Sequence, residues 1–584
     1  MIGDDLRARV TAWIADDPDE RDRAELTALL AVATAAATAA DSDSGSDAAQ
    51  AAGDLADRFA GRLQFGTAGL RGKVGAGPNR MNRAVVRGTT AALAGWLRYV
   101  NPAAAESGVV IGCDARHRSD EFALEAARVL AGAGIAVHLL PPRQPTPLLA
   151  FAVRHLRAAA GVMITASHNP PADNGYKLYL ADGAQIVPPA DLEIEAAIRA
   201  LGPLAEIPVT GGDDPLIARH DDQIARAYLD AVCAGAQAPK GAAWLRIIYT
   251  PLHGVACELA LRAFEQAGFP PPDVVEAQAE PDPDFRTVAF PNPEEPGTLD
   301  LAIAQARRSG ADLVIANDPD GDRLAVAVPD DTATGGWRML TGDQVGALLG
   351  AYVLGRAGGD ADRAGGDAEP RRPLVATTIV SSTMLARIAT EAGAAYAETL
   401  TGFKWIARAG DLRPECRFVY GYEEALGYAV GTAVRDKDGI SAALAVLGLA
   451  ALARSGGESL LEAYDALEAA HGVHLTGQIT VPTTVPVDVM SRLRVTAPTE
   501  LAGQPVLSVS DLTGGTADLP SADVLRYTLP GARVVIRPSG TEPKIKAYLE
   551  VVEPVIAGRL DEARHAARAR MDPLREAVRD LLAS

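Results

Sequence analysis

Cysteine is scarce in this sequence, and long apolar runs are absent. The 584 residues include 4 cysteines, at Cys113, Cys233, Cys257 and Cys416. They form no C-x-x-C pair, which argues against a zinc knuckle and a disulfide framework, so we expect them to be reduced bystanders. The longest apolar stretch, Ser441 to Ala453, is too short to cross a bilayer.

Positive charge is also in short supply. The 55 Lys and Arg residues face 75 Asp and Glu residues, which gives a formal net charge of -20. Such a surface repels nucleic acid and anionic membranes, so neither is an expected partner, and an anionic ligand needs a local cluster of Lys and Arg. The start, "MIGDDLRARV", carries acids where a signal peptide needs a basic start and an apolar run. These features predict a cytoplasmic protein.

The chain is long enough for three or four domains, and its composition is that of an ordinary α/β protein. Residues 1–60 are expected to be helical, interrupted by a flexible loop over Thr38 to Asp54. From Leu63 onward, helical and strand-like segments alternate, which indicates parallel strands with crossover helices. Gly355 to Pro373 is rich in Gly, Asp and Arg and is predicted to be a surface insertion. The predicted domains are 61–205, 206–332 and 333–474, all α/β, and 475–584, which is α+β.

The most informative loop is "NDPDGDRL", directly after an apolar strand. Asp318, Asp320 and Asp322 crowd three carboxylates into one tight turn, and such crowding needs a cation. Hard oxygen ligands suit Mg²⁺ or Ca²⁺, and Mg²⁺ characteristically takes few carboxylates plus a phosphate oxygen. An exposed acidic turn is the alternative. An EF-hand is disfavoured because Gly321 is the fourth residue of the loop, whereas an EF-hand has Gly at the sixth. Pro329 also occupies the position of the last Glu of an EF-hand loop.

Two further loops carry groups for a phosphosugar. "RPSGTEPKIKAY" combines Arg537, short hydroxyls, an exposed Gly backbone and lysines, which suits a phosphate dianion, although a hairpin turn with solvated charges explains it too. "GYEEALGY" places Glu423 and Glu424 between Tyr422 and Tyr428. Carboxylates accept hydrogen bonds from vicinal hydroxyls, and the tyrosines are expected to pack against a sugar face. A solvated charge pair at a helix start fits this segment nearly as well.

The stretch "GVMITASHNPPADNGYKLY" is predicted to be a buried strand that ends in a polar loop. Open α/β sheets hold ligands at such strand ends, so Ser167 is well placed for chemistry, although Ser and Asn with Pro also make ordinary turns. His168 and Lys177 are candidate acid/base groups, with a bracing role and a surface charge as the alternatives. Softer candidates in similar loops are Arg71, Lys73, Arg116 and His253.

Taken together, these loops resemble the α-D-phosphohexomutase superfamily, the phosphoglucomutases and phosphomannomutases. "TASHNP" resembles its phosphoserine loop, "DPDGDR" its metal loop, "GYEEALGY" its sugar loop and "RPSGTEPK" its phosphate loop, in the family's order. The match extends from about Leu63 to Tyr548. It implies four domains around a central cleft: three related α/β domains with mixed sheets sandwiched by helices, and a C-terminal α+β domain. With "FGTAGLRG" and "YTPLHG", the sequence is most similar to the long phosphoglucomutase and phosphopentomutase branch.

The resemblance also implies a mechanism. Ser167 carries a phosphoryl group and contacts one Mg²⁺ held by the three aspartates. The phosphoryl group passes to the sugar phosphate, and the bisphosphorylated sugar turns in the cleft and returns its other phosphate to Ser167. A sugar 1,6-bisphosphate is the implied activator, and Lys177, with His168 and Arg71, the implied catalytic set. The implied substrate-binding residues are Arg323, Thr401, Gly402, Glu423, Glu424, Lys437, Arg537, Ser539, Gly540, Thr541 and Lys546.

One departure affects the substrate. Bacterial phosphomannomutase/phosphoglucomutases have Glu-x-Ser-Gly-His in the sugar loop, whereas this chain has Leu426 and Tyr428 in place of the Ser and His. Glucose phosphates are the first choice, mannose phosphates a second substrate, and ribose or deoxyribose phosphates the alternative. The chain is expected to be a monomer or a dimer. Two other classes are a haloacid-dehalogenase-type Mg²⁺ phosphatase, with Asp318 as nucleophile, and a non-catalytic sugar-phosphate sensor.

Overall fold

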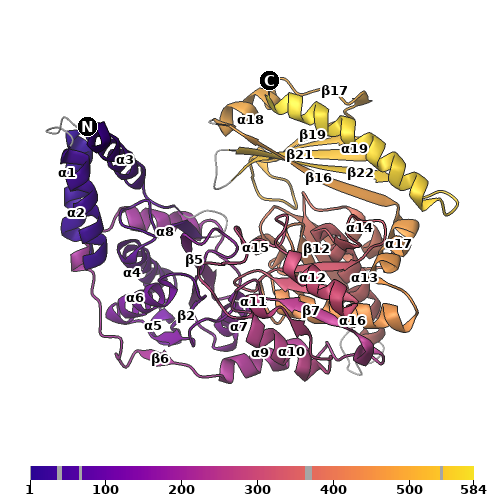
Figure 1. Cartoon of the computed structure of the whole chain (residues 1–584), viewed down its shortest axis with the longest axis horizontal. Helices are drawn as coiled ribbons and strands as arrows, with labels where there is room; N and C mark the ends of the chain where they lie inside the picture. Colours follow the sequence, from indigo (N-terminus) through magenta and orange to yellow (C-terminus); the bar gives the residue numbers. More distant parts are fainter. Residues whose placement is uncertain are drawn as a thin grey trace.

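The chain folds into a helical N-terminal part, three α/β units and a C-terminal unit, which Figure 1 shows in sequence order from indigo to yellow. Each α/β unit has a mixed sheet, and the C-terminal unit is α+β, so the predicted fold class is confirmed. The computed structural model describes residues 2–35, 42–64, 69–361, 371–483, 485–539 and 544–583.

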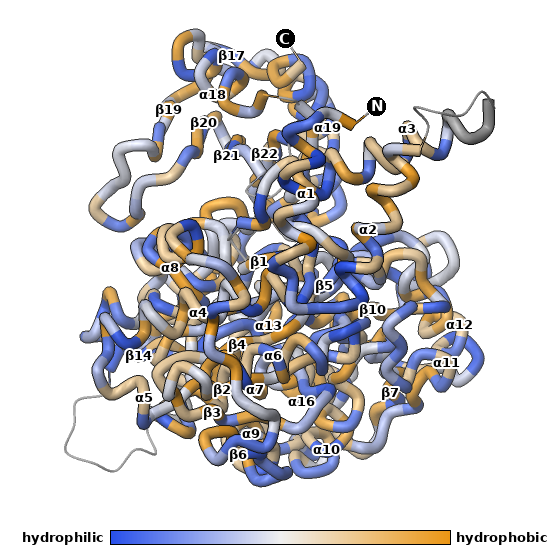
Figure 2. The backbone as a smooth tube through the Cα atoms, turned by 90° about the vertical axis from the view of Figure 1, so that its left-hand side faces the viewer, coloured by the Kyte–Doolittle hydropathy of each residue, from blue (hydrophilic) through white to orange (hydrophobic). Residues whose placement is uncertain are grey.

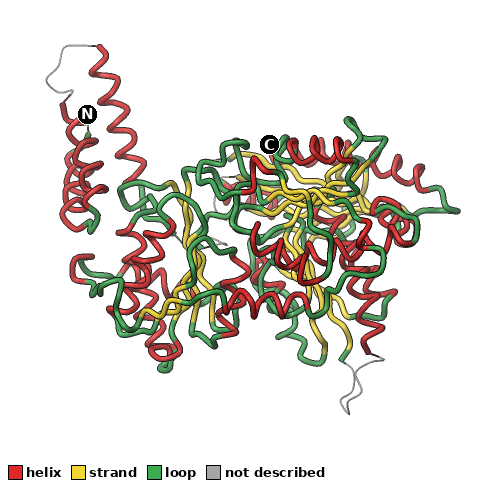
Figure 3. The backbone as a smooth tube through the Cα atoms, turned by 60° about the horizontal axis from the view of Figure 1, so that its bottom comes forward, coloured by secondary structure: helices red, strands yellow, loops and turns green. Residues whose placement is uncertain are grey.

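Three N-terminal helices pack on each other through a small apolar core, to which Val10, Leu26 and Leu55 contribute. They project beyond the rest of the molecule in Figure 3. The loop predicted for Thr38 to Asp54 is wrong from residue 42 onward, because a helix covers that part; residues 36–41 lie outside the described residues. Its Ala residues, at a spacing that buries Ala48 and Ala51, favour a helix over a loop. The helices are α1 (Asp4–Asp16), α2 (Glu20–Ala35) and α3 (Ser42–Arg58).

The first α/β unit has a six-stranded sheet in the order β1-β5-β4-β2-β3-β6. Strands β2, β3, β4 and β6 are parallel, whereas β5 pairs antiparallel with both β4 and β1. Strand β6 extends this sheet beyond the domain limit predicted at residue 205. The strands are β1 (Leu70–Lys73), β2 (Val109–Cys113), β3 (Val137–Leu139), β4 (Ala160–Ile164), β5 (Asp173–Leu180) and β6 (Ile217–Arg219). The helices are α4 (Arg83–Val100), α5 (Ala104–Ser107), α6 (Ser119–Gly132), α7 (Thr146–His155) and α8 (Ala190–Arg199).

The second unit has the strand order β11-β10-β9-β7-β8. Strands β7, β8 and β9 are parallel, and β10 turns back antiparallel to β9 across the acidic loop. The strands are β7 (Ile247–Thr250), β8 (Asp273–Val274), β9 (Leu313–Asn317), β10 (Leu324–Pro329) and β11 (Trp337–Met339). The helices are α9 (Gln223–Cys233), α10 (Cys257–Ala267), on which α9 packs, α11 (Glu276–Ala279) and α12 (Asp300–Ser309).

The third unit has the order β13-β12-β14-β15, with only β15 antiparallel to its neighbour. Part of the insertion predicted for Gly355 to Pro373 is helical instead, since α13 continues to Ala361; residues 362–370 lie outside the described residues. The strands are β12 (Arg372–Thr378), β13 (Ala395–Thr399), β14 (Cys416–Glu423) and β15 (Gly427–Val430). The helices are α13 (Gly342–Ala361), α14 (Met384–Glu391), α15 (Phe403–Ile406), α16 (Gly439–Ser455) and α17 (Leu460–His471).

The C-terminal unit has an antiparallel sheet in the order β16-β22-β21-β20-β19, covered by a long helix at the end of the chain. It lies beside the other units and not among them, as both Figure 1 and Figure 2 show at the top of the molecule. The strands are β16 (Val473–Pro482), β17 (Glu500–Leu501), β18 (Gln504–Pro505), β19 (Ser508–Asp511), β20 (Leu525–Leu529), β21 (Ala532–Pro538) and β22 (Lys544–Glu553). The helices are α18 (Pro486–Val495) and α19 (Leu560–Ala583).

The apolar cores are distributed unequally among these units. One continuous core contains residues of the second and third units and, from the first unit, residues of α7 and of strands β2, β4 and β5; it includes Leu149, Ile315 and Leu444. The C-terminal unit has a separate core around Val534 and Leu549. In the described part of the chain, no single helix is long and apolar enough to span a membrane, and one pair, α16 and α17, bent by 88°, meets that test jointly.

Candidate active site

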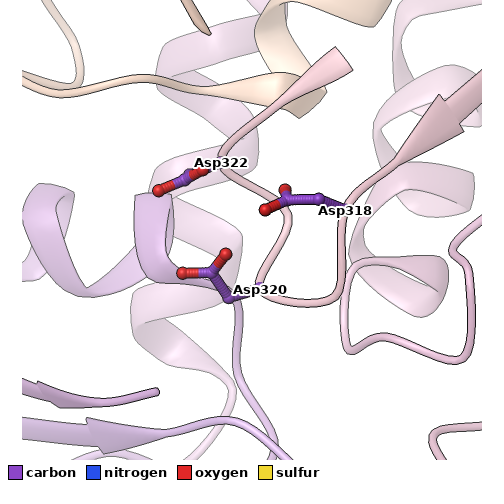
Figure 4. Close-up of side chains that lie close together, drawn as sticks. All are labelled: Asp318, Asp320 and Asp322. Atoms are coloured by element: carbon purple, nitrogen blue, oxygen red, sulfur yellow. The ribbon is translucent and has the colours of Figure 1, made fainter. Parts of the chain in front are cut away.

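The acidic loop forms a buried turn between two antiparallel strands of the second unit. Asp318 directly follows β9, and Asp322 stands two residues before β10. The side chains of Asp318, Asp320 and Asp322 are at most 1% exposed, and one carboxylate oxygen of each lies within 4.8 Å of the others. Figure 4 shows the three carboxylates on this single tight loop, turned to the same side.

The donor set of this loop fits a hard divalent cation. Oδ1 of Asp320 and Oδ1 of Asp322 are buried and have no hydrogen-bond partner in the described part of the chain. An unpaired buried carboxylate oxygen is costly, and a cation with oxygen ligands would satisfy both atoms. Burial, followed by repulsion from Asp322, raises the pKa of Asp320, as expected for carboxylates held this close.

Ser167 lies beside the acidic loop although it comes from another unit. It follows β4 by three residues, as predicted, and its backbone is left-handed, with φ 53°. A positive φ at a non-Gly residue is strained, and such strain gathers at functional sites. Ser167 Oγ donates a hydrogen bond to Asp318 Oδ2 at 2.8 Å and lies 3.2 Å from His168 Nδ1. Burial, together with Arg323 and Arg71, lowers the pKa of His168 well below its usual range.

Lys177 joins strand β5 of the first unit to the acidic loop of the second. From the middle of β5, its ammonium donates to Asp320 Oδ2 at 2.6 Å and to Asp322 Oδ2 at 2.8 Å. Burial opposes the charge on Lys177, but the two carboxylates outweigh it and raise the pKa of its ammonium. Burial likewise opposes ionisation of Asp322, but Lys177 and Lys437 outweigh it and hold the pKa of that carboxyl well below its usual range.

The sugar-type loop between β14 and β15 contacts the acidic loop through Arg323 and Lys437. Arg323 donates to the carbonyl of Ala425 at 2.5 Å, and its backbone N–H donates to Asp318 Oδ1 at 2.9 Å. Lys437 Nζ lies 3.5 Å from Asp322 Oδ2. The structure therefore brings Ser167, Lys177, Arg323, Lys437 and the acidic triad into one buried cluster.

The two adjacent glutamates occupy different surroundings. Glu424 Oε2 accepts hydrogen bonds from Thr378 Oγ1 at 3.2 Å and Ser381 Oγ at 3.1 Å. Burial raises the pKa of Glu424 and also that of Glu423, although Lys437 and Arg323 oppose the rise at Glu423.

The two tyrosines of this segment do not form a sugar-binding face, so that prediction is wrong. Tyr422 and Tyr428 are both fully buried, stacked with their ring centroids 6.5 Å apart. Tyr422 Oη donates to Asp343 Oδ1 at 3.1 Å, inside the third unit. Both rings pack in the core because their strands, β14 and β15, are covered by α13 and α16.

The phosphate-type loop is described only in part, since Gly540 and Thr541 lie outside the described residues. Arg537 and Lys546 pair across strands β21 and β22, and the backbone N–H of Ser539 donates to the carbonyl of Lys544 at 2.8 Å. Lys546 acts electrostatically on the carboxyl of Glu294, on which Arg323 and Glu423 act too. Charges from the second, third and C-terminal units thus act on Glu294, a residue that the sequence analysis does not name.

The remaining residues named from the sequence have contacts mainly within their own units. Arg71, in β1, donates to Asn169 Oδ1 at 3.1 Å, and burial lowers the pKa of its guanidinium against the opposing charge of Asp320. Thr401 and Gly402 are half-buried just before α15, where Gly402 takes φ 107°. His253 hydrogen-bonds Thr287 within the second unit. Lys73 lies in β1 opposite Asp173.

Arg116 is the strongest contributor that the sequence left undefined. Its buried guanidinium donates to the carbonyls of Ser167 at 2.7 Å, Asn169 at 2.5 Å, Pro170 at 2.8 Å and Asp173 at 3.0 Å. It thereby fixes the backbone around Ser167. All four acceptors are backbone carbonyls, which every residue type has, so no side chain in the sequence marks this role. The only hint is the D-x-R sequence after an apolar strand.

Thr146, at the start of α7, was missed as well. It donates from Oγ1 to Asp320 Oδ2 at 2.5 Å, and its backbone N–H donates to the carbonyl of Asp320 at 2.9 Å.

Comparison with known protein families covers the four units. The models for Phosphoglucomutase/phosphomannomutase match as alpha/beta/alpha domain I at residues 62–203, domain II at 226–333, domain III at 341–470 and the C-terminal domain at 490–567.

Similar proteins extend this match to nearly whole chains. A probable phosphomannomutase of Haemophilus influenzae is 42% identical over 80% of this chain and 93% of its own. A probable phosphoribomutase of Schizosaccharomyces pombe is 36% identical over 93% of each chain. The crystal structure of a phosphoglucomutase/phosphomannomutase family protein from Burkholderia thailandensis is 21% identical, covers 88% of this chain and 97% of its own, and has the same fold, with a TM-score of 0.66.

Proposed function

Because the chain belongs to the phosphoglucomutase/phosphomannomutase family, and is thus a mutase and an isomerase, we propose that it interconverts glucose 1-phosphate and glucose 6-phosphate, with mannose phosphates as second substrates. The observation that carries the proposal is the hydrogen bond of 2.8 Å from Ser167 Oγ to Asp318. It joins a strained, buried serine of one unit to the acidic triad of another, where a phosphoryl group on Ser167 would meet a metal site.

We assign the metal to Mg²⁺, one per chain, held by Asp318, Asp320, Asp322 and the phosphorylated Ser167. When bound, it supplies neutralisation of the negative charge that gathers during phosphoryl transfer. We choose Mg²⁺ because the proposed ligands are three carboxylates and one oxygen of the phosphate on Ser167, and Mg²⁺ typically binds few carboxylates together with phosphate oxygens.

The chain's own side chains divide the remaining work. Ser167 gives its phosphoryl group to the sugar phosphate and takes the other one back after the bisphosphorylated sugar has turned. Lys177 lies beside the acidic triad, where it moves a proton at the sugar hydroxyl, and the neutral His168 orients Ser167 Oγ. A sugar 1,6-bisphosphate is the activator, because it loads Ser167.

The binding groups form two sets. Glu423 and Glu424 accept hydrogen bonds from sugar hydroxyls, and Arg323 and Lys437 balance charge next to the triad. The set for the non-reacting phosphate, the same as that predicted from the sequence, is Arg537, Ser539, Gly540, Thr541 and Lys546. Thr401 and Gly402 complete the sugar side.

The second candidate substrate is a pentose phosphate, converted between its 1- and 5-phosphates. The observation in its favour is the relative named phosphoribomutase, which is 36% identical along 93% of each chain. Leu426 and Tyr428 are both fully buried, so neither replaces the Ser and His contacts that the bacterial pattern gives to the sugar. The sugar must therefore be selected by the glutamates and the residues that hold them.

The test is a side-by-side assay of glucose 1-phosphate, mannose 1-phosphate and ribose 1-phosphate, with Mg²⁺ and a trace of glucose 1,6-bisphosphate. We expect glucose 1-phosphate to have the highest kcat/KM, with mannose 1-phosphate second. A preference for ribose 1-phosphate would replace the first candidate with the second. Release of inorganic phosphate from all three without isomerisation would contradict both. The cytoplasmic location and the monomeric or dimeric state stay predictions from the sequence.

A further inference from the structure

The joint between the third unit and the C-terminal unit lies along one face of strand β21. Successive side chains of a strand point to opposite faces, so Arg533, Val535 and Arg537 share one face. Val535 packs in a small apolar cluster with Ile379 and Val380 of the third unit. Arg533 is at one end of this row, and Arg537, of the proposed phosphate loop, lies roughly 13 Å away at the other.

Arg533 binds the third unit at several points. Its Nη1 donates to Glu398 Oε1 at 3.2 Å and to the carbonyl of Ile379 at 3.3 Å, and its Nη2 donates to the carbonyl of Ser381. Within its own unit, its Nε donates to Glu550 Oε2 at 2.7 Å. Its planar guanidinium therefore fixes the orientation of β21 against the loop that contains Ser381.

Ser381 is buried. Its carbonyl accepts from Arg533, and its side-chain hydroxyl binds Glu424 of the sugar-type loop. Its Oγ donates to Glu424 Oε2 at 3.1 Å and accepts from the backbone N–H of Glu424 at 3.2 Å. It also lies 2.8 Å from Thr378 Oγ1, the second group that holds Glu424. One residue thus binds the carboxylate of Glu424 through its side chain and Arg533 through its carbonyl.

We propose that Ser381 and Arg533 are positioning residues that couple the grip of Glu424 on the sugar to the seating of the phosphate-binding strand β21. If the C-terminal unit shifts, the Ser381 loop moves with Arg533 and changes the position of the Glu424 carboxylate. A sugar phosphate contacts both Glu424 and Arg537, so it favours the arrangement in which both side chains are in their binding positions. Inorganic phosphate occupies one end of the row only. The inference rests on the proposed function, which assigns Glu424 to the sugar and Arg537 to the phosphate.

The experiment is a double-mutant cycle with Ser381→Ala and Arg533→Met in the full chain. Binding of glucose 1-phosphate and of inorganic phosphate is measured by calorimetry in a Ser167→Ala background, where no turnover disturbs the titration. Each variant is expected to weaken glucose 1-phosphate binding about tenfold, and the double variant is expected to lose little more than either alone. Ser381→Ala is expected to leave inorganic phosphate binding unchanged.

The matched control is Arg526→Met, which removes another ion pair of the same joint. Arg526 Nη1 donates to Glu398 Oε2 at 2.7 Å, whereas the carbonyl of Ser381 accepts from Arg533. Combined with Ser381→Ala, it is expected to give multiplying losses. Arg533→Lys retains the positive charge but not the planar fork, and serves if Arg533→Met fails to fold; Ser381→Thr, which retains the hydroxyl, is expected to restore sugar-phosphate binding.

Losses that multiply to about a hundredfold in the Ser381 and Arg533 double variant would overturn the coupling, as would identical behaviour of the Arg526 control. Failure of the proposed function would look different. In that case the chain with Ser167 intact would isomerise none of the three sugar phosphates. If it prefers mannose or ribose 1-phosphate, that ligand replaces glucose 1-phosphate in the cycle.

Discussion

The junction around the acidic loop and the junction of the C-terminal unit are built differently. At the first, Ser167, Lys177 and Thr146 all donate to the acidic triad from the first unit, and every one of these side chains is at most 1% exposed. A continuous apolar core, with residues of the first, second and third units, supports it. At the second, the C-terminal unit has a separate core and meets the third through a small apolar cluster and a set of polar contacts, among them those of Arg526, Arg533, Glu550 and Arg564.

The number of buried hydrogen bonds predicts that the triad junction is the more rigid of the two. Phosphoryl transfer needs its reacting groups held to a fraction of an ångström, and the densely bonded triad junction provides that. In the proposed mechanism the substrate turns between two half-reactions, which requires a binding element that releases and reseats. A unit with a separate core and a largely polar joint suits that role.

The largest effect is expected at the centre of the rigid junction. Ser167→Ala should lower mutase activity by at least about 10⁴-fold, since it removes the hydroxyl that is proposed to carry the phosphoryl group. The variant should still fold, with its unfolding free energy lowered by about 1–3 kcal/mol, because the change removes the buried hydrogen bond to Asp318 but little packing. Steady-state assays and intact-mass measurement of phosphorylation by glucose 1,6-bisphosphate test this. Ser309→Ala, an exposed serine on α12, is the control and should remain fully active.

Retention of most activity in a folded Ser167→Ala protein would remove the phosphoserine assignment. It would also make the strained backbone at Ser167 an ordinary turn.

The comparison of the two junctions is tested next by stability. Leu149→Ala opens a cavity in the continuous core, and Leu549→Ala opens one in the separate C-terminal core, each at a cost of about 2–5 kcal/mol. In scanning calorimetry, Leu549→Ala should lower the transition of the C-terminal unit alone, whereas Leu149→Ala should lower the transition of the remaining units. If both variants shift one single transition equally, the two regions unfold together and the contrast fails.

Metal dependence gives the third test. Asp320→Asn removes a carboxylate charge from the triad, so half-maximal activity should require about 10- to 100-fold more Mg²⁺. Lys177 loses one of its two carboxylate partners as well, so the maximal rate is followed separately from the Mg²⁺ titration. Asp331→Asn, on an exposed turn of the second unit, is the control. An unchanged titration in Asp320→Asn would count against the metal loop.

The sequence predicted those parts of the site that depend on local pattern. Three aspartates in one turn after an apolar strand can only crowd together, and Ser167 could be placed at a strand end from the turn residues that follow it. The juxtaposition of these two loops came from the family resemblance, since no local rule fixes contacts between distant units. The residues that support them, Thr146 and Arg116, have no signature because their partners are carbonyls or distant carboxylates.

The sequence did not predict which side chains are buried by contacts between distant segments. Tyr422 and Tyr428 were assigned to a sugar face because aromatic rings next to acids suit carbohydrate, yet both strands are covered on that side by helices. The Ala, Ser and Asp content of the segment from Ser42 predicts a loop, but the apolar contacts of its second half favour a helix. Composition predicts local preference, and tertiary packing overrides it.

The smallest expected effect concerns Asp343, which lies beneath Tyr422 near the joint. Burial raises the pKa of Asp343 from its ordinary value of 3.8 to about 6, against opposing hydrogen bonds such as that from the backbone N–H of Ser382. The folded state therefore binds this proton more tightly than the unfolded state does, so stability falls as the pH rises between these two values. Between pH 4 and pH 6 this group should cost about 2 kcal/mol of unfolding free energy.

Asp343→Asn removes that titration but retains an acceptor for Tyr422 and Ser382. Its unfolding free energy, measured by denaturant titration at several pH values, should fall less steeply between pH 4 and pH 6 than that of the parent chain. Asp331→Asn should follow the parent. Parallel curves for Asp343→Asn and the parent would mean that the Asp343 carboxyl is ionised at low cost. The joint would then be better solvated than its buried neighbours indicate, and the C-terminal unit would be held more loosely than the contacts of Arg533 suggest.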